Sequence, residues 1–158
     1  MDIRPPELNL PAYDFRTRMV EGTASVYDPL RKKYVAATPE EWVRLHLIQA
    51  LIEFRDFPRG LIKVEHSIRA HGRPRRCDAV VYDRELRPRM IIECKAPDVR
   101  IDQTTFDQIA VYNVALRTEF LLVSNGREHY CCRVDFDRGA VEFIGDLPHY
   151  SELTSSQD

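Results

Sequence analysis

Three residues, Asp78, Glu93 and Lys95, combine side-chain types and spacing that could perform metal-dependent chemistry. Glu93 and Lys95 end an apolar run in the stretch RMIIECKAP, which otherwise has the composition of a buried strand. Burying charged groups is costly unless the charges are paired or serve a function. Because side chains alternate along a strand, Glu93 and Lys95 share one face and Cys94 points to the other.

An antiparallel hairpin would bring Asp78 to the same place. A register that pairs Ala79 with Ile92 puts Asp78 opposite Glu93 and the turn within the polar segment 83–88. Directly opposed side chains have Cβ atoms about 4.5–5.5 Å apart. Two carboxylates this close repel each other unless a cation lies between them, and a hard divalent ion with oxygen ligands suits such a pocket.

This arrangement predicts a hydrolytic phosphodiester site. The metal would be bound by Asp78 and Glu93, and the backbone carbonyl of Cys94 could add a further oxygen. Lys95 would orient a metal-activated water or neutralise a phosphate. The simpler alternative is an ion pair of Lys95 with Asp78 or Glu93 at a sheet edge, without chemistry.

A cysteine-nucleophile enzyme is a separate alternative. It would use Cys94 with a histidine such as His66 or His71. We disfavour it because Cys94 should face away from the charged residues, opposite Cys77.

Two expected helices carry further candidates. Glu41 follows Thr38-Pro39, a helix start, and it is either a third metal carboxylate or the glutamate of a capping box. Gln108 and Tyr112, four residues apart, share a face of the later helix. They could reach a phosphate or steady the lysine, or they are a surface amide and a packed tyrosine.

The surrounding pattern predicts an α/β fold, with a mixed central sheet flanked by helices. Short strands are expected at about 1–37 and a polar, loose tail at 151–158, so we expect residues 1–158 to form a single domain with its core at 38–150. The helices are expected at about 39–55 and 102–116. The remaining strands are expected at Leu61 to Arg69, Arg76 to Tyr82, Arg89 to Lys95, Phe120 to Ser124, Tyr130 to Val134 and Ala140 to Ile144.

Composition limits the partners. The net charge is -2, but residues 59–100 hold eleven basic and six acidic side chains. This excess either lies by chance on a solvated surface or marks contacts to an anionic partner, with Arg73 and Arg76 as candidates for binding DNA. The sequence has no long apolar run, so we expect no membrane span, and its four cysteines lack C-x-x-C spacing, which suits the cytoplasm.

Several segments in order resemble a known family. The stretches TPEEWVR, RRCDAVVYD, IIECKAP, FDQIAVYN and SNGREHYCC are similar to the N-terminal nuclease-type domain of type I restriction enzyme R subunits, within the PD-(D/E)xK superfamily. The resemblance covers about Tyr13 to Tyr150. It implies a restriction-endonuclease-like core and Mg²⁺-dependent DNA cleavage, with Mn²⁺ as a substitute.

The resemblance also implies roles by position. Asp78 and Glu93 would be metal ligands, Glu41 an additional ligand, Lys95 the catalytic lysine, and Gln108 and Tyr112 the Q-x-x-x-Y pair. Two positions depart from the pattern: Cys77 stands in place of proline, and Leu45 where glutamine is expected.

A larger departure is the motor. The sequence contains no G-x-x-x-x-G-K-[ST], so it predicts a nuclease-like domain without ATP-driven translocation, working with separate motor or specificity subunits. The alternative function is a non-catalytic module that binds nucleic acid or a partner protein and retains the fold.

Overall fold

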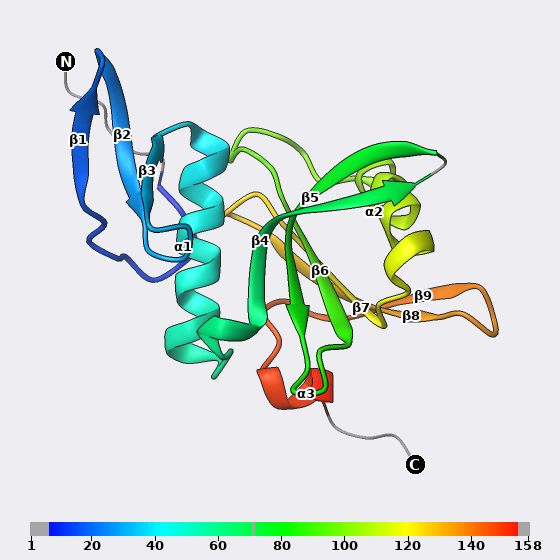
Figure 1. Ribbon diagram of the computed structural model, residues 1–158. Helices are drawn as coiled ribbons and strands as arrows, with labels where there is room; N and C mark the ends of the chain where they lie inside the picture. Colours follow the sequence, from blue (N-terminus) through cyan, green and yellow to red (C-terminus); the bar gives the residue numbers. More distant parts are fainter. Residues whose placement is uncertain (1–6, 71, 155–158) are drawn as a thin grey trace.

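The described part of the chain folds into two sheets and three α-helices (Figure 1). The computed structural model describes residues 7–70 and 72–154. Within them, β1, β2 and β3 form one sheet in that order, and β4 to β9 form a six-stranded sheet, also in chain order. The six-stranded sheet is mixed, because every neighbouring pair is antiparallel except β6 and β7.

The N-terminal sheet is a small antiparallel unit beside α1. Its strands are β1 (Thr17–Val20), β2 (Thr23–Asp28) and β3 (Lys33–Ala36). One face is apolar, since Val26 is fully buried and packs with Phe15 and with Leu45 of α1. The other face of the sheet points away from α1.

Helix α1 (Pro39–Phe54) begins where the sequence predicts. The Thr38 hydroxyl accepts a hydrogen bond from the Glu41 amide at 3.2 Å, and Pro39 occupies the first turn. Nine consecutive residues, 43–51, are buried, including Arg44, His46 and Gln49. The helix therefore lies between the two sheets and has little exposed surface at its centre.

The central hairpin has the predicted register. Strand β5 (Arg73–Tyr82) pairs with β6 (Pro88–Cys94) through Ala79–Ile92, Val80–Ile91 and Val81–Met90. Its turn is held by Asp83, whose carboxylate accepts hydrogen bonds from the amides of Glu85 and Arg87.

Strand β5 is three residues longer at its start than the sequence suggested. It pairs with β4 (Ile62–Ala70) as far as Arg73, while its pairing with β6 ends at Ala79. Asp78 is therefore the first residue of β5 beyond its ladder with β6.

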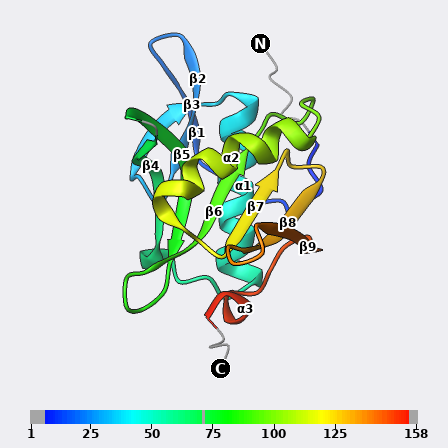
Figure 2. The same cartoon turned by 90° about the vertical axis from the view of Figure 1, so that its right-hand side faces the viewer.

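Two layers of helix cover the six-stranded sheet. Helix α1 packs on one face, and α2 (Gln103–Leu116) packs on the other (Figure 2). Helix α2 is also the crossover between the parallel strands β6 and β7 (Phe120–Ser124). It begins at Asp102, which caps the first turn, and ends at Arg117 in the left-handed conformation. This crossover puts the start of α2 close to the end of β6.

The C-terminal region departs from the expected loose tail. After β8 (His129–Asp135) and β9 (Ala140–Gly145), residues Tyr150–Thr154 form a short helix, α3. Leu153 is fully buried against the core, and this burial holds the segment in place. Residues 155–158 lie outside the described part. None of the helices in the described part has the length and apolar character needed to span a bilayer.

Candidate active site

Asp78 and Glu93 lie on adjacent strands at the point where β5 and β6 stop pairing. The Cys94 amide, which continues β6, donates a hydrogen bond of 2.6 Å to Oδ2 of Asp78. This bond ties the acid of one strand to the backbone between the two motif residues of the other.

The Lys95 ammonium group lies beside Glu93. Its Nζ lies 3.6 Å from Oε1 of Glu93, and both side chains are largely buried, with 26% and 12% exposed. The Lys95 amide donates to the carbonyl of Ser124 at 2.8 Å, which fixes the start of the loop after β6. Lys95 therefore contacts Glu93, and Asp78 is bound to the backbone between these two residues.

One oxygen of Glu93 has no partner. Its Oε2 is buried and makes no hydrogen bond to the residues that the structure describes. A buried carboxylate oxygen without a donor is costly, so this atom is available for a ligand such as a cation.

The electrostatics of the pair follow from burial. Burial, and then the charge of Asp78, raises the pKa of Glu93 to about 8, with Lys95 acting in the opposite direction. Burial also raises the pKa of Asp78, against the hydrogen bond from Cys94 and the charges of Arg44 and Lys95. A divalent cation bound between the two carboxylates would favour the ionised form of both.

Helix α1 contributes Arg44 and Glu40 to this environment. The charge of Glu40 adds to the rise in the pKa of both Asp78 and Glu93, whereas Arg44 lowers the pKa of Asp78. Burial, and then neighbouring Arg31, lowers the pKa of Arg44 itself. Neither Arg44 nor Glu40 was among the predicted site residues. The spacing of Arg44 with the candidate Glu41, three positions apart on a helix, was the signal that could have revealed the arginine.

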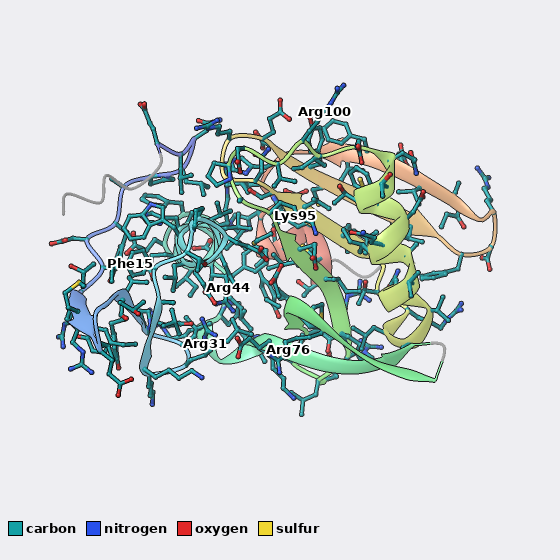
Figure 3. The ribbon with its side chains drawn as sticks, turned by 90° about the horizontal axis from the view of Figure 1, so that it is seen from above. Phe15, Arg31, Arg44, Arg76, Lys95 and Arg100 are labelled. Carbon is teal, nitrogen blue, oxygen red and sulfur yellow. The ribbon has the colours of Figure 1, made fainter. Side chains whose placement is uncertain are left out.

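Glu41 makes contacts that neither of its two predicted roles includes. Its carboxylate pairs with Arg44 and, at 3.0 Å, with Arg31 from the turn between β2 and β3. Arg31 also reaches Asp28 and Glu65, each at 2.5 Å. In the structure, Glu41 therefore belongs to an ion network that joins the N-terminal sheet to α1 and β4, and its Oε2 contacts both arginines. Figure 3 shows Arg31 and Arg44 near each other.

Glu65 of β4 has an unusual backbone conformation at this network. Its φ is 53°, and it lies between the paired residues Val64–Ala79 and His66–Cys77, level with Asp78. A left-handed conformation at a non-glycine residue is strained. Here it coincides with the ion pair of Glu65 with Arg31.

Two acids, Asp78 and Glu93, lie together at this site. Within residues 7–70 and 72–154, no group of three His, Cys, Asp or Glu side chains is arranged to hold a metal ion. Mg²⁺ commonly uses one or two carboxylates and completes its shell with water and substrate phosphate. Asp78 and Glu93, with the unpartnered Oε2, fit that donor set.

The structure describes only some of the remaining predicted residues. Gln108 is exposed on α2, and the structure does not describe the side chain of Tyr112. Arg76 is exposed on β5, whereas the side chains of Arg73 and His66, and residue 71, lie outside the described part. The cysteine-nucleophile alternative finds no support, because Cys94 is completely buried and burial raises the pKa of its thiol far above the usual value.

The SNGREHYCC stretch positions the loop that follows Lys95. Ser124 Oγ contacts Nδ1 of His129 at 2.7 Å and accepts from the Gly126 amide. Asn125 donates from its side chain to the carbonyl of Val99 at 2.9 Å. This turn therefore supports residues 96–100 from the neighbouring strand.

Comparison of the sequence with known protein families identifies the family of this chain. Residues 39–148 match the family model described as type I restriction enzyme R protein N terminus (HSDR_N). The chain belongs to this family. The matched region contains the Asp78–Glu93–Lys95 site, α1 and α2, but it begins after the N-terminal sheet.

A solved structure has a similar fold. It is the fragment structure of a chain assigned as an HsdR subunit of a type I restriction enzyme from Vibrio vulnificus YJ016, with a TM-score of 0.50 and 16% sequence identity. The match covers 70% of this chain and 24% of that chain, so this chain spans about a quarter of the relative. No curated protein matches the sequence. The mixed sheet with its flanking helices, together with this neighbour, is consistent with the restriction-endonuclease-like fold of R-protein N-terminal domains.

Proposed function

We propose that this R-protein N-terminal domain hydrolyses phosphodiester bonds of DNA with Mg²⁺ bound at Asp78 and Glu93. The observation that carries the proposal is the buried, unpartnered Oε2 of Glu93 beside a second carboxylate and an ammonium group. A bound divalent ion would supply charge to stabilise the transition state and would lower the pKa of an attacking water. Mn²⁺, which accepts the same oxygen ligands, would substitute.

The protein's own groups would orient the reaction. The Cys94 amide holds Asp78 in place, so one ligand is fixed before a metal arrives. Lys95 lies within 3.6 Å of Glu93 and would hold the attacking water or a phosphate oxygen at the same point. Preorganised charges of this kind stabilise the negative charge that develops on the phosphate.

DNA would approach across the rim of the site. We assign phosphate contacts to Arg73 and Arg76 of β5 and supporting contacts to Gln108 and Tyr112 of α2. Arg76 and Gln108 are exposed, as this role requires. For Glu41, a role as third ligand would require its release from Arg31 and Arg44, so we propose Glu40 as the α1 acid that acts on the site. Separate motor or specificity subunits would supply translocation and sequence choice in the cytoplasm.

The test combines metal uptake with cleavage. Titration calorimetry with Mg²⁺ should give one site in the wild type, no site in Asp78→Asn or Glu93→Gln, and an intact site in Lys95→Ala. Plasmid nicking with Mg²⁺ or Mn²⁺ should be lost in all three variants. Asp137→Asn, which changes an exposed acid between β8 and β9, is the matched control and should behave as the wild type. Nicking that persists in Asp78→Asn would contradict the proposal.

A non-catalytic binding module is the second candidate. The observation that favours it is that only two acids converge among the described residues, with a third, Glu65, held by Arg31. This candidate predicts DNA binding of equal affinity with and without Mg²⁺, and no heat of specific metal uptake in the same calorimetric titration.

A further inference from the structure

The outer face of the N-terminal sheet carries a row of arginine and tyrosine side chains. Tyr27 and Tyr34 are directly opposed in the β2–β3 ladder. On its other side, the Tyr27 amide donates a hydrogen bond to the carbonyl of Arg16, the residue before β1. Val26, the neighbour of Tyr27, is buried toward α1, so Tyr27 must point to the opposite face. Figure 3 shows Phe15 on the buried side, between this sheet and α1.

The four side chains form a continuous series of contacts on this face. The guanidinium of Arg18 lies 3.8 Å from the centre of the Tyr34 ring, and that of Arg16 lies 5.9 Å from the Tyr27 ring. The two tyrosine rings are 5.3 Å apart and meet edge to face, at 62°. The two tyrosines thus lie together, with a guanidinium group at each end of the series.

The N-terminal sheet also carries an excess of positive charge, with five basic and three acidic side chains in residues 13–36. Arg16 and Arg18 on this face and Lys32 in the β2–β3 turn are exposed, and none of them forms an ion pair with a carboxylate in the described part of the chain. Asp28 is buried and engaged by Arg31, which leaves Asp14 and Glu21 as the exposed acids of this unit. A ligand for this face should therefore be an anion that also offers flat surfaces.

We propose that the outer face of β1–β3 is a binding site for single-stranded nucleic acid. Unpaired bases stack on tyrosine rings and on guanidinium planes, while the backbone phosphates are attracted to Arg16 and to Lys32 in the adjoining turn. One face of the planar Arg18 guanidinium covers the Tyr34 ring. Its other face is the first position on which a base would stack. Duplex DNA offers the charge but keeps its base faces within the helix, so it should bind this face less well.

This site is distinct from the acid pair. It lies on the far side of α1 from the six-stranded sheet (Figure 1), and the family match begins at residue 39, after the sheet. Binding here requires neither metal nor hydrolysis. The inference therefore goes beyond the proposed function, and it is testable in EDTA, where the metal site cannot contribute.

The experiment measures anisotropy of a labelled twenty-nucleotide oligothymidine in EDTA. Tyr34→Leu and Arg18→Gln should each weaken binding about five- to tenfold relative to the wild type, because each removes about one stacking contact. Tyr34→Phe keeps the ring and should bind as the wild type. Arg117→Gln is the matched control, because Arg117 covers the Phe136 ring at 4.3 Å at the end of α2, away from this sheet.

Two competitor ligands separate stacking from charge. An abasic oligonucleotide of equal length, and a duplex of the same length, should each bind at least fivefold more weakly than oligothymidine. Near-ultraviolet circular dichroism confirms that each variant is folded. The proposal is overturned if the abasic strand or the duplex binds as tightly as oligothymidine, or if Tyr34→Leu binds as the wild type.

Discussion

The backbone amide of Cys94 donates a 2.6 Å hydrogen bond to the carboxylate of Asp78. The contact that holds this acid therefore does not depend on the side chain at position 94, which points into the core beside Ala79 and Ile92. The side chain at position 94 should therefore affect core packing, whereas the position of the Asp78 carboxylate depends on the backbone amide of residue 94.

Cys94→Ala tests this separation. We expect Mg²⁺ affinity and any nuclease activity within twofold of the wild type, and a loss of about 1 kcal/mol in the free energy of unfolding from the small cavity. Urea denaturation and metal titration measure the two quantities. Loss of activity in a folded Cys94→Ala protein would instead revive the cysteine-nucleophile alternative.

The stability of the metal-free protein should fall with rising pH because of Glu93. Its pKa is raised from 4.5 to about 8 in the folded state, so the folded chain binds this proton more tightly than the unfolded chain does. The contribution to stability is therefore complete below about pH 4.5 and is lost as the pH rises to about 8, by on the order of 2–4 kcal/mol.

Glu93→Gln should remove most of this slope. Urea denaturation in EDTA at pH 5.5 and 8.5 compares the two proteins, and Mg²⁺ should restore the wild type at the higher pH. A wild type that is more stable at pH 8.5 than at pH 5.5, with Glu93→Gln unchanged, would contradict the assignment.

Removing Arg31 should destabilise the protein. Arg31→Met leaves Asp28, Glu41 and Glu65 without a shared counter-ion, and its side chain is only 9% exposed. We expect a loss of about 2–3 kcal/mol, less than a fully buried pair because Glu41 and Glu65 are partly solvated. Lys32→Met, at the adjacent exposed position, is the control and should change stability by less than about 0.5 kcal/mol.

A double variant separates the loss of the Arg31 ion pairs from the loss of Arg31 packing, as two contributions to the change in the free energy of unfolding. Adding Glu65→Gln to Arg31→Met removes one uncompensated charge and should recover part of the loss. If the double variant is less stable than Arg31→Met alone, the carboxylates do not repel one another as we infer.

Neighbouring glutamates of α1 should give different effects. Glu40→Gln removes a charge that acts on Asp78 and Glu93, so the pKa of both should fall and Mg²⁺ should bind about threefold more weakly, with stability unchanged. Glu41→Gln breaks the contacts to Arg31 and Arg44 and should cost about 2 kcal/mol. Carboxyl-resolved NMR titration and urea denaturation distinguish them, and identical behaviour of the two variants would refute this division.

Sequence predicts the centre of the site because its determinants are local. Alternation along two strands, with a polar turn between them, fixes which side chains oppose, and the Ala79–Ile92 register is confirmed. The start of α1 is predicted for the same reason, since Thr38 and Pro39 act within one helical turn.

The surroundings of the site could not be predicted in the same way. Glu41 pairs with Arg31 from a turn ten positions earlier, and that contact depends on how the N-terminal sheet packs on α1. Helical spacing correctly places Glu41 toward the interior, but it does not reveal that arginines fill that space. The short helix α3 forms because Leu153 finds a buried position on the distant core, which local sequence does not specify.

The turn held by Asp83 offers a practical handle on the molecule. It lies five residues along β5 from Asp78, about 16 Å at the usual rise of a strand, and Leu86 within it is 71% exposed. A fluorophore, affinity tag or surface tether attached there would leave the carboxylates unobstructed. Single molecules of the protein could thus be immobilised in a uniform orientation, with the acids accessible to a passing strand.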